Sequence, residues 1–273
     1  MIDLNQTLLA GKRIVVTRVA AQAIDLLKAL QHLGAMPILL PLIRILPPED
    51  FTLLDQALQR FHEFDWVLFT SQNSVRIVHE RIEKLQATSE IQIQTVLAGA
   101  VGDATATEAA NAGFRVSHIA SRPLGTVLAE ELGSCLEGKR VFLPRSDRAN
   151  LEMVVKLERF GARVTEVVAY RTLSETPQGS DVVAKAMNAD AILFFSPSAV
   201  EGFDDVCGAG KLDEFSRKGI VLASGPVTLA ALKEKGIAAA GAAKEPSVAR
   251  IIEALANSFA MRSDQSLGSG RTQ

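Results

Sequence analysis

The feature of this chain that most constrains its fold is an internal repeat. The segment FDWVLFTSQNSV, beginning at Phe64, returns as NADAILFFSPSAV, beginning at Asn188, with the same acidic residue, apolar run and serine-bearing turn. The match extends in both directions, as a genuine repeat should. The other matched pairs are GKRIVVTR from Gly11 with GKRVFLPR from Gly138, LGAMPILLPLIRIL from Leu33 with FGARVTEVVAYRTL from Phe160, VLAGAVGDATATEAANAGF from Val96 with VLASGPVTLAALKEKGI from Val221, and SRPLGTVLAEEL from Ser121 with AKEPSVARIIEAL from Ala243.

Each copy has the pattern of an α/β fold. Short apolar runs such as RIVVT, PILL and WVLFT alternate with stretches of helical periodicity such as AIDLLKALQHL. Strands that are apolar throughout are typical of parallel sheets with helices on both faces. We expect two doubly wound parallel-sheet domains, which the repeat alone divides near Gly138, with a ligand cleft between them. The polar, Gly- and Ser-rich residues 263–273 are expected to be disordered.

Composition excludes several classes of function. The 273 residues carry a formal net charge of −2, which is not the basic footprint of a nucleic-acid-binding protein. No apolar run approaches the roughly 18 residues of a membrane span, and the start MIDLNQTLLAGKR lacks the basic segment of a signal peptide. We therefore expect a cytoplasmic protein that binds neither nucleic acid nor membrane.

The cysteines and histidines give no indication of a metal site. Cys135 and Cys207 lie in different halves, and neither has a Cys or His partner at ligand spacing. The four histidines are scattered at positions 32, 62, 79 and 118, without an HxH or HxxxH pattern. We expect no metal and no cofactor.

Paired polar turns follow the repeated strand. Ser71 and Asn73 can cap the helix after the first copy, and Ser196 can cap the helix after the second, with Pro197 at its first position. In open α/β sheets, ligands bind at these carboxyl ends of strands. Ordinary helix capping explains the same residues, so both interpretations stay open.

A second pair of turns, VGDAT and SGPVT, places a glycine after the strand and a threonine three residues later. Gly102 thus aligns with Gly225, and Thr105 with Thr228. Glycine permits a tight turn and close approach of a ligand to the backbone, and the threonine hydroxyl can cap the helix or touch a ligand. The spacing differs from the GxxxxGKS and GxGxxG nucleotide motifs.

Arg18 and Arg145 end matching strands, and an arginine there suits a carboxylate or phosphate. A solvated surface arginine is an equally good interpretation of each. Tyr170 is the single tyrosine of the chain and aligns with Ile43 inside an apolar connection, where a hydroxyl needs a purpose. Simple core packing is its rival interpretation.

The chain also lacks the common catalytic motifs. There is no GxSxG sequence, no Cys-His pair and no evident pair of catalytic carboxylates. An enzyme of this composition is expected to act mainly by holding a reactive substrate in one shape.

Several segments of the chain together resemble the uroporphyrinogen-III synthase family. They are VVTR, FDWVLFTSQNSV, VGDATA, FLPRSDRANLEM, GARVTEVVAYRT and FFSPSAV. The resemblance covers residues 11–259, and FLPRSDRA with AYRT is its most specific part. Departures are mild: Val19 stands where a proline often follows VTR, and Phe195 stands where a threonine often precedes Ser-Pro.

The resemblance implies a fold and replaces the division near Gly138. It implies two flavodoxin-like domains joined by a two-stranded ladder, with residues 1–41 plus 173–273 in one domain and residues 43–170 in the other. It also implies an enzyme without cofactors, with a transient handover of substrate from the preceding deaminase. The absence of a long exposed apolar stripe in the sequence favours a monomer.

The implied activity is cyclisation of the linear tetrapyrrole hydroxymethylbilane to uroporphyrinogen III, with loss of water and inversion of ring D through a spiro intermediate. By the match to AYRT, Tyr170 would assist departure of the substrate hydroxyl. The substrate-binding residues would be Arg18, Ser71, Asn73, Gly102, Thr105, Arg145, Ser196, Pro197, Ser198, Gly225 and Thr228. The alternative functions are a non-catalytic two-domain binding module for an anionic metabolite and a diverged synthase that has lost activity.

Overall fold

The computed structural model describes residues 4–86, 91–175, 180–243 and 247–268. The chain divides into two compact units, residues 1–44 with 173–273 and residues 45–172. The division near Gly138 that the repeat alone suggests is wrong, because that residue lies inside the second unit.

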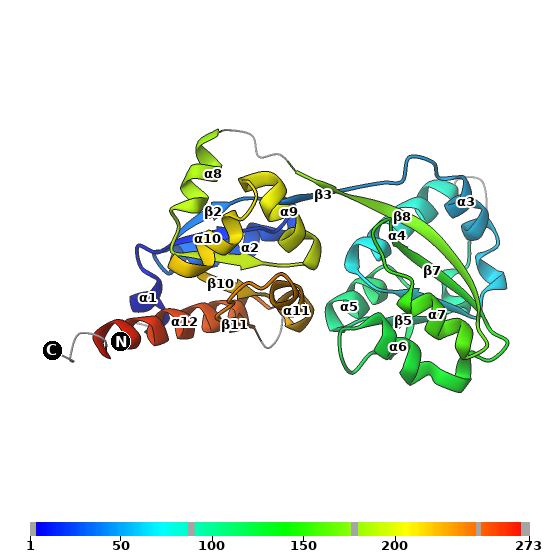
Figure 1. Cartoon of the computed structure of the whole chain (residues 1–273). Coiled ribbons are helices and arrows are strands. Elements are labelled where there is room, and N and C mark those ends of the chain that lie inside the picture. The colour runs from blue at the N-terminus through cyan, green and yellow to red at the C-terminus, as the bar shows by residue number, and fades with distance from the viewer. Residues whose placement is uncertain (1–3, 87–90, 176–179, 244–246, 269–273) are drawn as a thin grey trace. The chain divides into compact units, whose positions relative to one another are not determined.

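The first unit is built on a parallel sheet with the strand order β11-β10-β9-β1-β2 (Figure 1). Its strands are β1 (Arg13–Val16), β2 (Met36–Leu39), β9 (Ala191–Phe194), β10 (Ile220–Ala223) and β11 (Gly241–Ala242). Its helices are α1 (Leu4–Leu9), α2 (Ala20–His32), α8 (Ser180–Met187), α9 (Pro197–Cys207), α10 (Lys211–Lys218), α11 (Pro226–Glu234) and α12 (Val248–Gly268).

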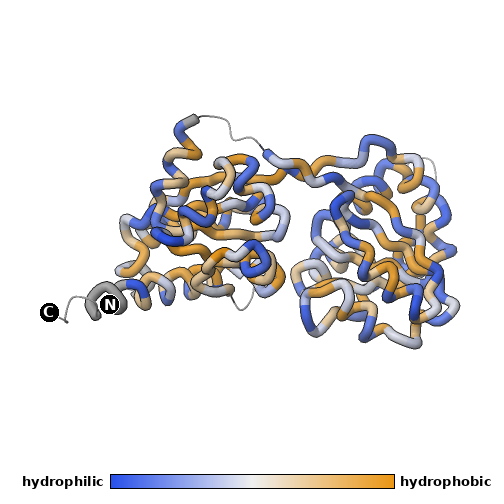
Figure 2. The backbone as a smooth tube through the Cα atoms, in the orientation of Figure 1, coloured by the Kyte–Doolittle hydropathy of each residue, from blue (hydrophilic) through white to orange (hydrophobic). Residues whose placement is uncertain are grey.

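Alternation along β1 shows how this sheet is buried on both faces. Ile14 and Val16 pack in one core with residues of α1, α2 and α12, whereas Val15 packs in the other core with residues of α9, α10 and α11. Figure 2 shows hydrophobic stretches running through the interior of each unit. The apolar strands of the sequence are therefore covered by helices on both sides, as a doubly wound sheet requires.

The second unit contains the sheet order β3-β8-β7-β4-β5-β6. Its strands are β3 (Ile43–Leu46), β4 (Trp66–Phe69), β5 (Leu97–Ala100), β6 (Arg115–Ile119), β7 (Arg140–Ser146) and β8 (Arg163–Ser174), of which β3 is cut by the unit boundary and β8 runs past it. Its helices are α3 (Thr52–Gln59), α4 (Gln72–Gln86), α5 (Asp103–Asn111), α6 (Gly125–Leu132) and α7 (Glu152–Arg159), with short 3₁₀ turns η1 (Phe61–Glu63), η2 (Ile93–Thr95) and η3 (Gly133–Leu136). Two apolar cores lie on its two faces.

The two units share one topology because the halves of the repeat are exchanged. The first unit joins β1 and β2 of one copy to β9, β10 and β11 of the other, and the second joins β7 and β8 to β4, β5 and β6. If the five strands of each unit are numbered 1 to 5 in the order just given, the first sheet and, apart from the added β3, the second sheet both have the flavodoxin-like order 2-1-3-4-5. The expected flavodoxin-like α/β fold is confirmed.

The exchange depends on β3 and β8, which pair with each other and carry the chain out of the first unit and back. At the end of this ladder, the backbone N–H of Glu175 donates to the carbonyl of Leu42 over 2.9 Å. Strand β8 also pairs in parallel with β7 along residues 163–170. The two-stranded ladder is thus present.

The repeated acidic residue has a structural task in both copies. The carboxylate of Asp65 accepts from the backbone N–H of Arg140 over 2.8 Å, and that of Asp190 accepts from the backbone N–H of Arg13 over 2.7 Å. Arg140 and Arg13 are the first residues of β7 and β1. Each aspartate, lying just before its own strand, therefore fixes the start of the neighbouring strand. The Arg140 N–H lowers the pKa of Asp65 more than partial burial raises it.

Helix α12 corrects one expectation. It continues to Gly268, so residues 263–268 are helical rather than disordered, and residues 269–273 lie outside the described part of the chain. Propagating a helix already anchored by core residues costs little per added residue. Within the described residues, no helix has the length and apolarity needed to cross a membrane.

Candidate active site

The topology selects one place in each unit where a ligand is expected. In a flavodoxin-like sheet the strand order reverses between the first and third strands, and ligands bind beyond the carboxyl ends of those strands. This point lies between β7 and β4 in the second unit and between β1 and β9 in the first. The sequence places Ser71, Arg145, Arg18 and Ser196 at these strand ends.

Tyr170 lies at this point of the second unit, on β8. Its hydroxyl oxygen is 3.0 Å from the Ser71 Oγ, although the two residues are 99 positions apart. The Tyr170 side chain is 7% exposed and packs in the core beside Val167 and Ala169. The structure therefore combines the two interpretations of Tyr170: the ring is a core residue, and the hydroxyl is held at the strand ends.

The protonation state of Tyr170 follows from its surroundings. Burial is the main cause that raises its pKa above the ordinary 10.0, and the charge of Asp147 adds to that effect. Hydrogen bonds to Ser71 and Ser146 and the charge of Arg145 act in the opposite direction. The net result is a neutral phenol at physiological pH, which can donate a hydrogen bond or a proton.

Ser71 is the capping residue at the start of α4. Its Oγ accepts from the backbone N–H of Ser74 over 3.2 Å, while the Ser74 hydroxyl donates to the Ser71 carbonyl over 2.7 Å. The expected capping by Ser71 is confirmed. Asn73 is instead the second residue of the helix, so the expectation that it caps is wrong.

Helix α5 follows β5, the strand that pairs with β4. Gly102 is its N-cap residue with φ of +86°, a left-handed conformation that favours glycine. No side chain caps this helix, and Thr105, 5% exposed, lies within the first turn, so its expected capping role is wrong. The amide of Gln72 donates to the Ala104 carbonyl over 3.1 Å, which joins the starts of α4 and α5.

Arg145 is engaged inside the second unit. It is 4% exposed, its Nη1 lies 3.0 Å from Glu166 Oε1, and its Nη2 donates to the carbonyl of Asn150. The Glu166 contact is an ion pair without hydrogen-bond alignment, because Nη1 has no partner of suitable geometry. Burial lowers the pKa of Arg145, and Glu166 opposes this. The guanidinium is thus directed at protein groups. This differs from both sequence interpretations, which were a ligand contact and a solvated surface arginine.

In the first unit, Ser196 begins α9 as expected. Its Oγ accepts from the backbone N–H of Ala199 over 3.1 Å, and Pro197 occupies the first helical position. Ser198, the next residue, is half-buried. The neighbouring strand end is joined to β9 by Thr17, whose buried hydroxyl donates to the Leu193 carbonyl over 2.8 Å.

Arg18 lies at the same edge, two residues beyond β1. Its guanidinium is 5.3 Å from the centroid of the Phe195 ring, and its Nε donates to Gln22 over 3.3 Å. Both Arg18 and Phe195 are half-buried. In contrast to Arg145, this arginine keeps part of its surface available to solvent at the strand ends.

Gly225 and Thr228 complete the first unit's edge. Gly225 is the N-cap of α11 with φ of −175°, which is extended backbone that any residue adopts, so it is not needed for a tight turn. A Cβ atom at Gly225 would meet nothing within 4 Å. Thr228 is 4% exposed within the first turn, and no side chain caps α11, so capping by Thr228 is also wrong.

Comparison with known proteins decides the family. The family model described as uroporphyrinogen-III synthase HemD matches residues 25–253, most of the chain. The chain belongs to the uroporphyrinogen-III synthase family. It is 29% identical over 227 residues to the uroporphyrinogen-III synthase of Synechococcus elongatus, a match that covers 81% of this chain and 85% of that protein.

Solved structures of synthases share the fold. A mutant uroporphyrinogen III synthase from the extremely thermophilic bacterium Thermus thermophilus aligns with a TM-score of 0.69 and 16% identity, covering 92% of this chain and 100% of that one. The synthase of Helicobacter pylori aligns with a TM-score of 0.55 and 20% identity, covering 89% and 97% of the two chains.

Sequence analysis did not predict three residues beside Tyr170 in this synthase-family chain, namely Ser146, Asp147 and Thr172. Asp147 accepts from the backbone N–H of Thr172 over 2.9 Å, and Ser146 Oγ lies 3.1 Å from Thr172 Oγ1. They belong to the quoted motifs SDRAN and AYRT, so the motif match could have indicated them. Their contacts join residues 25 and 26 positions apart, and a pattern of single residues does not show such pairing.

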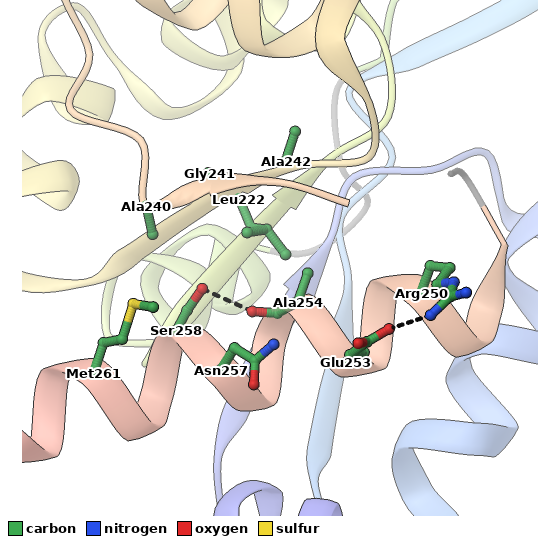
Figure 3. A pocket seen from close by; sticks show the side chains of 10 residues that line it. All are labelled: Leu222, Ala240, Gly241, Ala242, Arg250, Glu253, Ala254, Asn257, Ser258 and Met261. Atoms are coloured by element: carbon green, nitrogen blue, oxygen red, sulfur yellow. Dashed lines mark hydrogen bonds and ion pairs between the residues drawn. The ribbon is translucent and has the colours of Figure 1, made fainter. Parts of the chain in front are cut away.

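A pocket elsewhere in the first unit contains none of the predicted site residues. Figure 3 shows it between strand β11 and helix α12, lined by Leu222, Ala240, Gly241, Ala242, Arg250, Glu253, Ala254, Asn257, Ser258 and Met261. Arg250 pairs with Glu253 there over 2.8 Å. Among the residues that the structure describes, no group of three or more His, Cys, Asp or Glu could hold a metal ion.

Proposed function

We propose that this chain catalyses the cyclisation of hydroxymethylbilane to uroporphyrinogen III, with loss of water and inversion of ring D. The observation that carries the proposal is the family match over residues 25–253. The single tyrosine of the chain, held by Ser71 at the carboxyl edge of a flavodoxin-like sheet, supports it.

Tyr170 supplies the proton for the leaving group in this proposal. The bond between the substrate's hydroxymethyl carbon and its oxygen breaks, the phenol proton leaves with the hydroxyl as water, and an azafulvene cation remains. Attack by the substituted carbon of ring D gives the spiro intermediate, which opens and recloses with ring D inverted. The proton released on closure returns to the Tyr170 oxygen, so the enzyme ends unchanged. A raised pKa keeps the phenol protonated before the step.

The carboxylates of the substrate are bound mainly by backbone N–H groups. Helices α4, α5, α9 and α11 all begin at carboxyl ends of strands, where their N-termini favour anions. Ser71, Ser196 and Ser198 would add hydroxyls, and Gly102 and Gly225 would permit close approach. Arg18 is the proposed cationic contact, whereas Arg145 is proposed to hold the protein's own loop through Asn150.

The test is the isomer of the product. Hydroxymethylbilane closes spontaneously to isomer I, so formation of isomer III by the purified protein supports the synthase. The binding-module alternative and an inactive synthase both leave isomer I as the only product at every concentration of folded protein.

We further propose that the enzyme is a cytoplasmic monomer that receives its substrate from the preceding deaminase. The exposed large hydrophobic side chains of the described residues are distributed over several elements of both units, as monomers commonly show. Sedimentation of the purified protein tests the monomer, and isomer III yield in coupled against separated deaminase reactions tests the handover.

A further inference from the structure

Strand β8 contains a bulge immediately before Tyr170. In its parallel pairing with β7, Arg145 lies opposite Val168, but the next residue, Ser146, lies opposite Tyr170. Ala169 is therefore an extra residue with no partner on β7. A bulge bends the strand and redirects the side chains that follow, and bulges are enriched next to active sites.

The bulge changes the face to which Tyr170 belongs. Val167 and Ala169 are buried at 5% and 0% exposure, and Val168 between them points outward at 44%. Uninterrupted alternation would give Tyr170 the outward face of Val168. Tyr170 is instead 7% exposed, in the same core as Val167 and Ala169. The extra residue thus directs the phenol toward Ser71.

Asp147 fastens β8 at Tyr170 and two residues beyond it. Its backbone N–H donates to the Tyr170 carbonyl over 3.0 Å, and its Oδ1 accepts from the Thr172 N–H over 2.9 Å. The same Oδ1 accepts from the Ser146 hydroxyl over 3.0 Å. Strand β7 ends at Ser146, so its ladder does not continue beside Thr172. The Asp147 side chain supplies the hydrogen-bond acceptor that the Thr172 N–H would otherwise lack on the β7 side.

We propose that Asp147 is a positioning residue for Tyr170: its carboxylate oxygen holds the bulged end of β8 so that the phenol meets Ser71. The proposal rests on the proposed function, in which Tyr170 donates the proton. In this proposal the position of one hydrogen-bond acceptor oxygen of Asp147, rather than its negative charge, keeps the Tyr170 phenol in place.

Two substitutions separate position from charge. Asp147→Asn removes the charge but keeps an oxygen that accepts from Thr172, whereas Asp147→Ala removes both. Glu158→Ala is the matched control, because Glu158 is an exposed acidic residue of α7 in the same unit. We expect Asp147→Ala to lower kcat by about tenfold or more with little change in KM, since small misplacements of catalytic groups cost that much. Asp147→Asn and Glu158→Ala should stay within about twofold of wild type.

The outcome is read in the Tyr170→Phe background as well. If Asp147 acts through Tyr170, Asp147→Ala causes no further loss of kcat there, because residues that act as a unit are not additive. The proposal is overturned if Asp147→Ala keeps wild-type kcat, if Asn and Ala lower kcat equally, or if the loss persists in the Tyr170→Phe background.

A second readout does not depend on activity. Since the chain has a single tyrosine, its ring signals in an NMR spectrum of tyrosine-labelled protein report Tyr170 alone. They should move in Asp147→Ala and stay near their wild-type positions in Asp147→Asn. If wild type forms no isomer III, the proposed function fails, while unmoved ring signals in Asp147→Ala overturn the positioning role separately.

Discussion

The hydroxyl oxygens of Tyr170 and Ser71 lie 3.0 Å apart at the carboxyl edge of the second unit's sheet. Ser71 also accepts from the backbone N–H of Ser74, so the serine that begins α4 is the same one that holds the phenol. The start of α4 and the Tyr170 side chain of β8, which are far apart in sequence, thus meet at the carboxyl edge of the sheet.

Replacing Tyr170 with phenylalanine should reduce turnover while the fold survives. The ring keeps its core contacts, and one hydrogen bond is lost, which costs about 1 kcal/mol of unfolding free energy. Loss of a general acid lowers kcat by about 100-fold or more. Steady-state rates of isomer III formation and denaturant unfolding measure the two effects. Full turnover in a folded Tyr170→Phe variant would remove the proton-donor role.

The alkaline stability of the protein should depend on Tyr170. Its pKa in the folded state lies above the ordinary 10.0, so the folded state holds the proton more tightly than the unfolded chain. The stabilisation is complete below pH 10.0 and disappears as pH rises through the raised pKa. The difference in unfolding free energy between wild type and Tyr170→Phe should therefore shrink above pH 10.0. Cys207, whose pKa is raised to about 11, titrates in both proteins. Its contribution therefore cancels in the difference between their unfolding free energies.

The two arginines at the strand ends should respond in opposite ways. Removing Arg145 takes away a buried side chain together with its contacts to Glu166 and the Asn150 carbonyl, so Arg145→Ala should lower the unfolding free energy by about 1 to 3 kcal/mol. Arg18→Ala should change stability by less than about 1 kcal/mol but raise KM, because Arg18 is the proposed substrate contact. Urea unfolding and KM determination distinguish them. A stable Arg145→Ala variant with only a raised KM would reverse the assignment.

The two glycines of the paired turns should also differ. Gly102 has φ of +86° and ψ of 158°, a region essentially confined to glycine, so Gly102→Ala should cost about 1 to 3 kcal/mol of stability. Gly225→Ala should be nearly neutral for folding, because φ is −175° and the new methyl group meets open space. If substrate approaches the Gly225 backbone, that methyl group raises KM. An unchanged KM in Gly225→Ala would show that the space is not used by substrate.

Sequence reasoning predicted the parts of the fold that depend on local pattern. The apolar runs with neighbouring helical periodicity identified parallel sheets, and the capping residues Ser71 and Ser196 lie where the turn chemistry places them. The repeat was also correct, but its halves are exchanged between the units, an arrangement that the family resemblance implied and the repeat alone did not. Exchange depends on the pairing of β3 with β8, which lie far apart in the sequence, and a local pattern contains no information on such pairing.

The site was less accessible from sequence for the same reason. Arg145 aligns with Arg18, yet Glu166 and Asn150 hold it in the interior, so equivalent residues in a repeat have different partners. Thr105 and Thr228 match in spacing but are buried in the first turns of α5 and α11 without capping them. The bulge at Ala169 depends on the register between β7 and β8, which only the paired strands reveal.

The isomer of the product shows whether the protein is an active synthase and whether Tyr170 takes part. Hydroxymethylbilane is generated in place, the purified wild-type or Tyr170→Phe protein is added, and the product is oxidised and separated into uroporphyrin isomers. Wild type should give isomer III in place of the spontaneous isomer I, and Tyr170→Phe should shift the product back toward isomer I at equal protein concentration. Isomer I alone with folded wild-type protein would contradict the synthase activity.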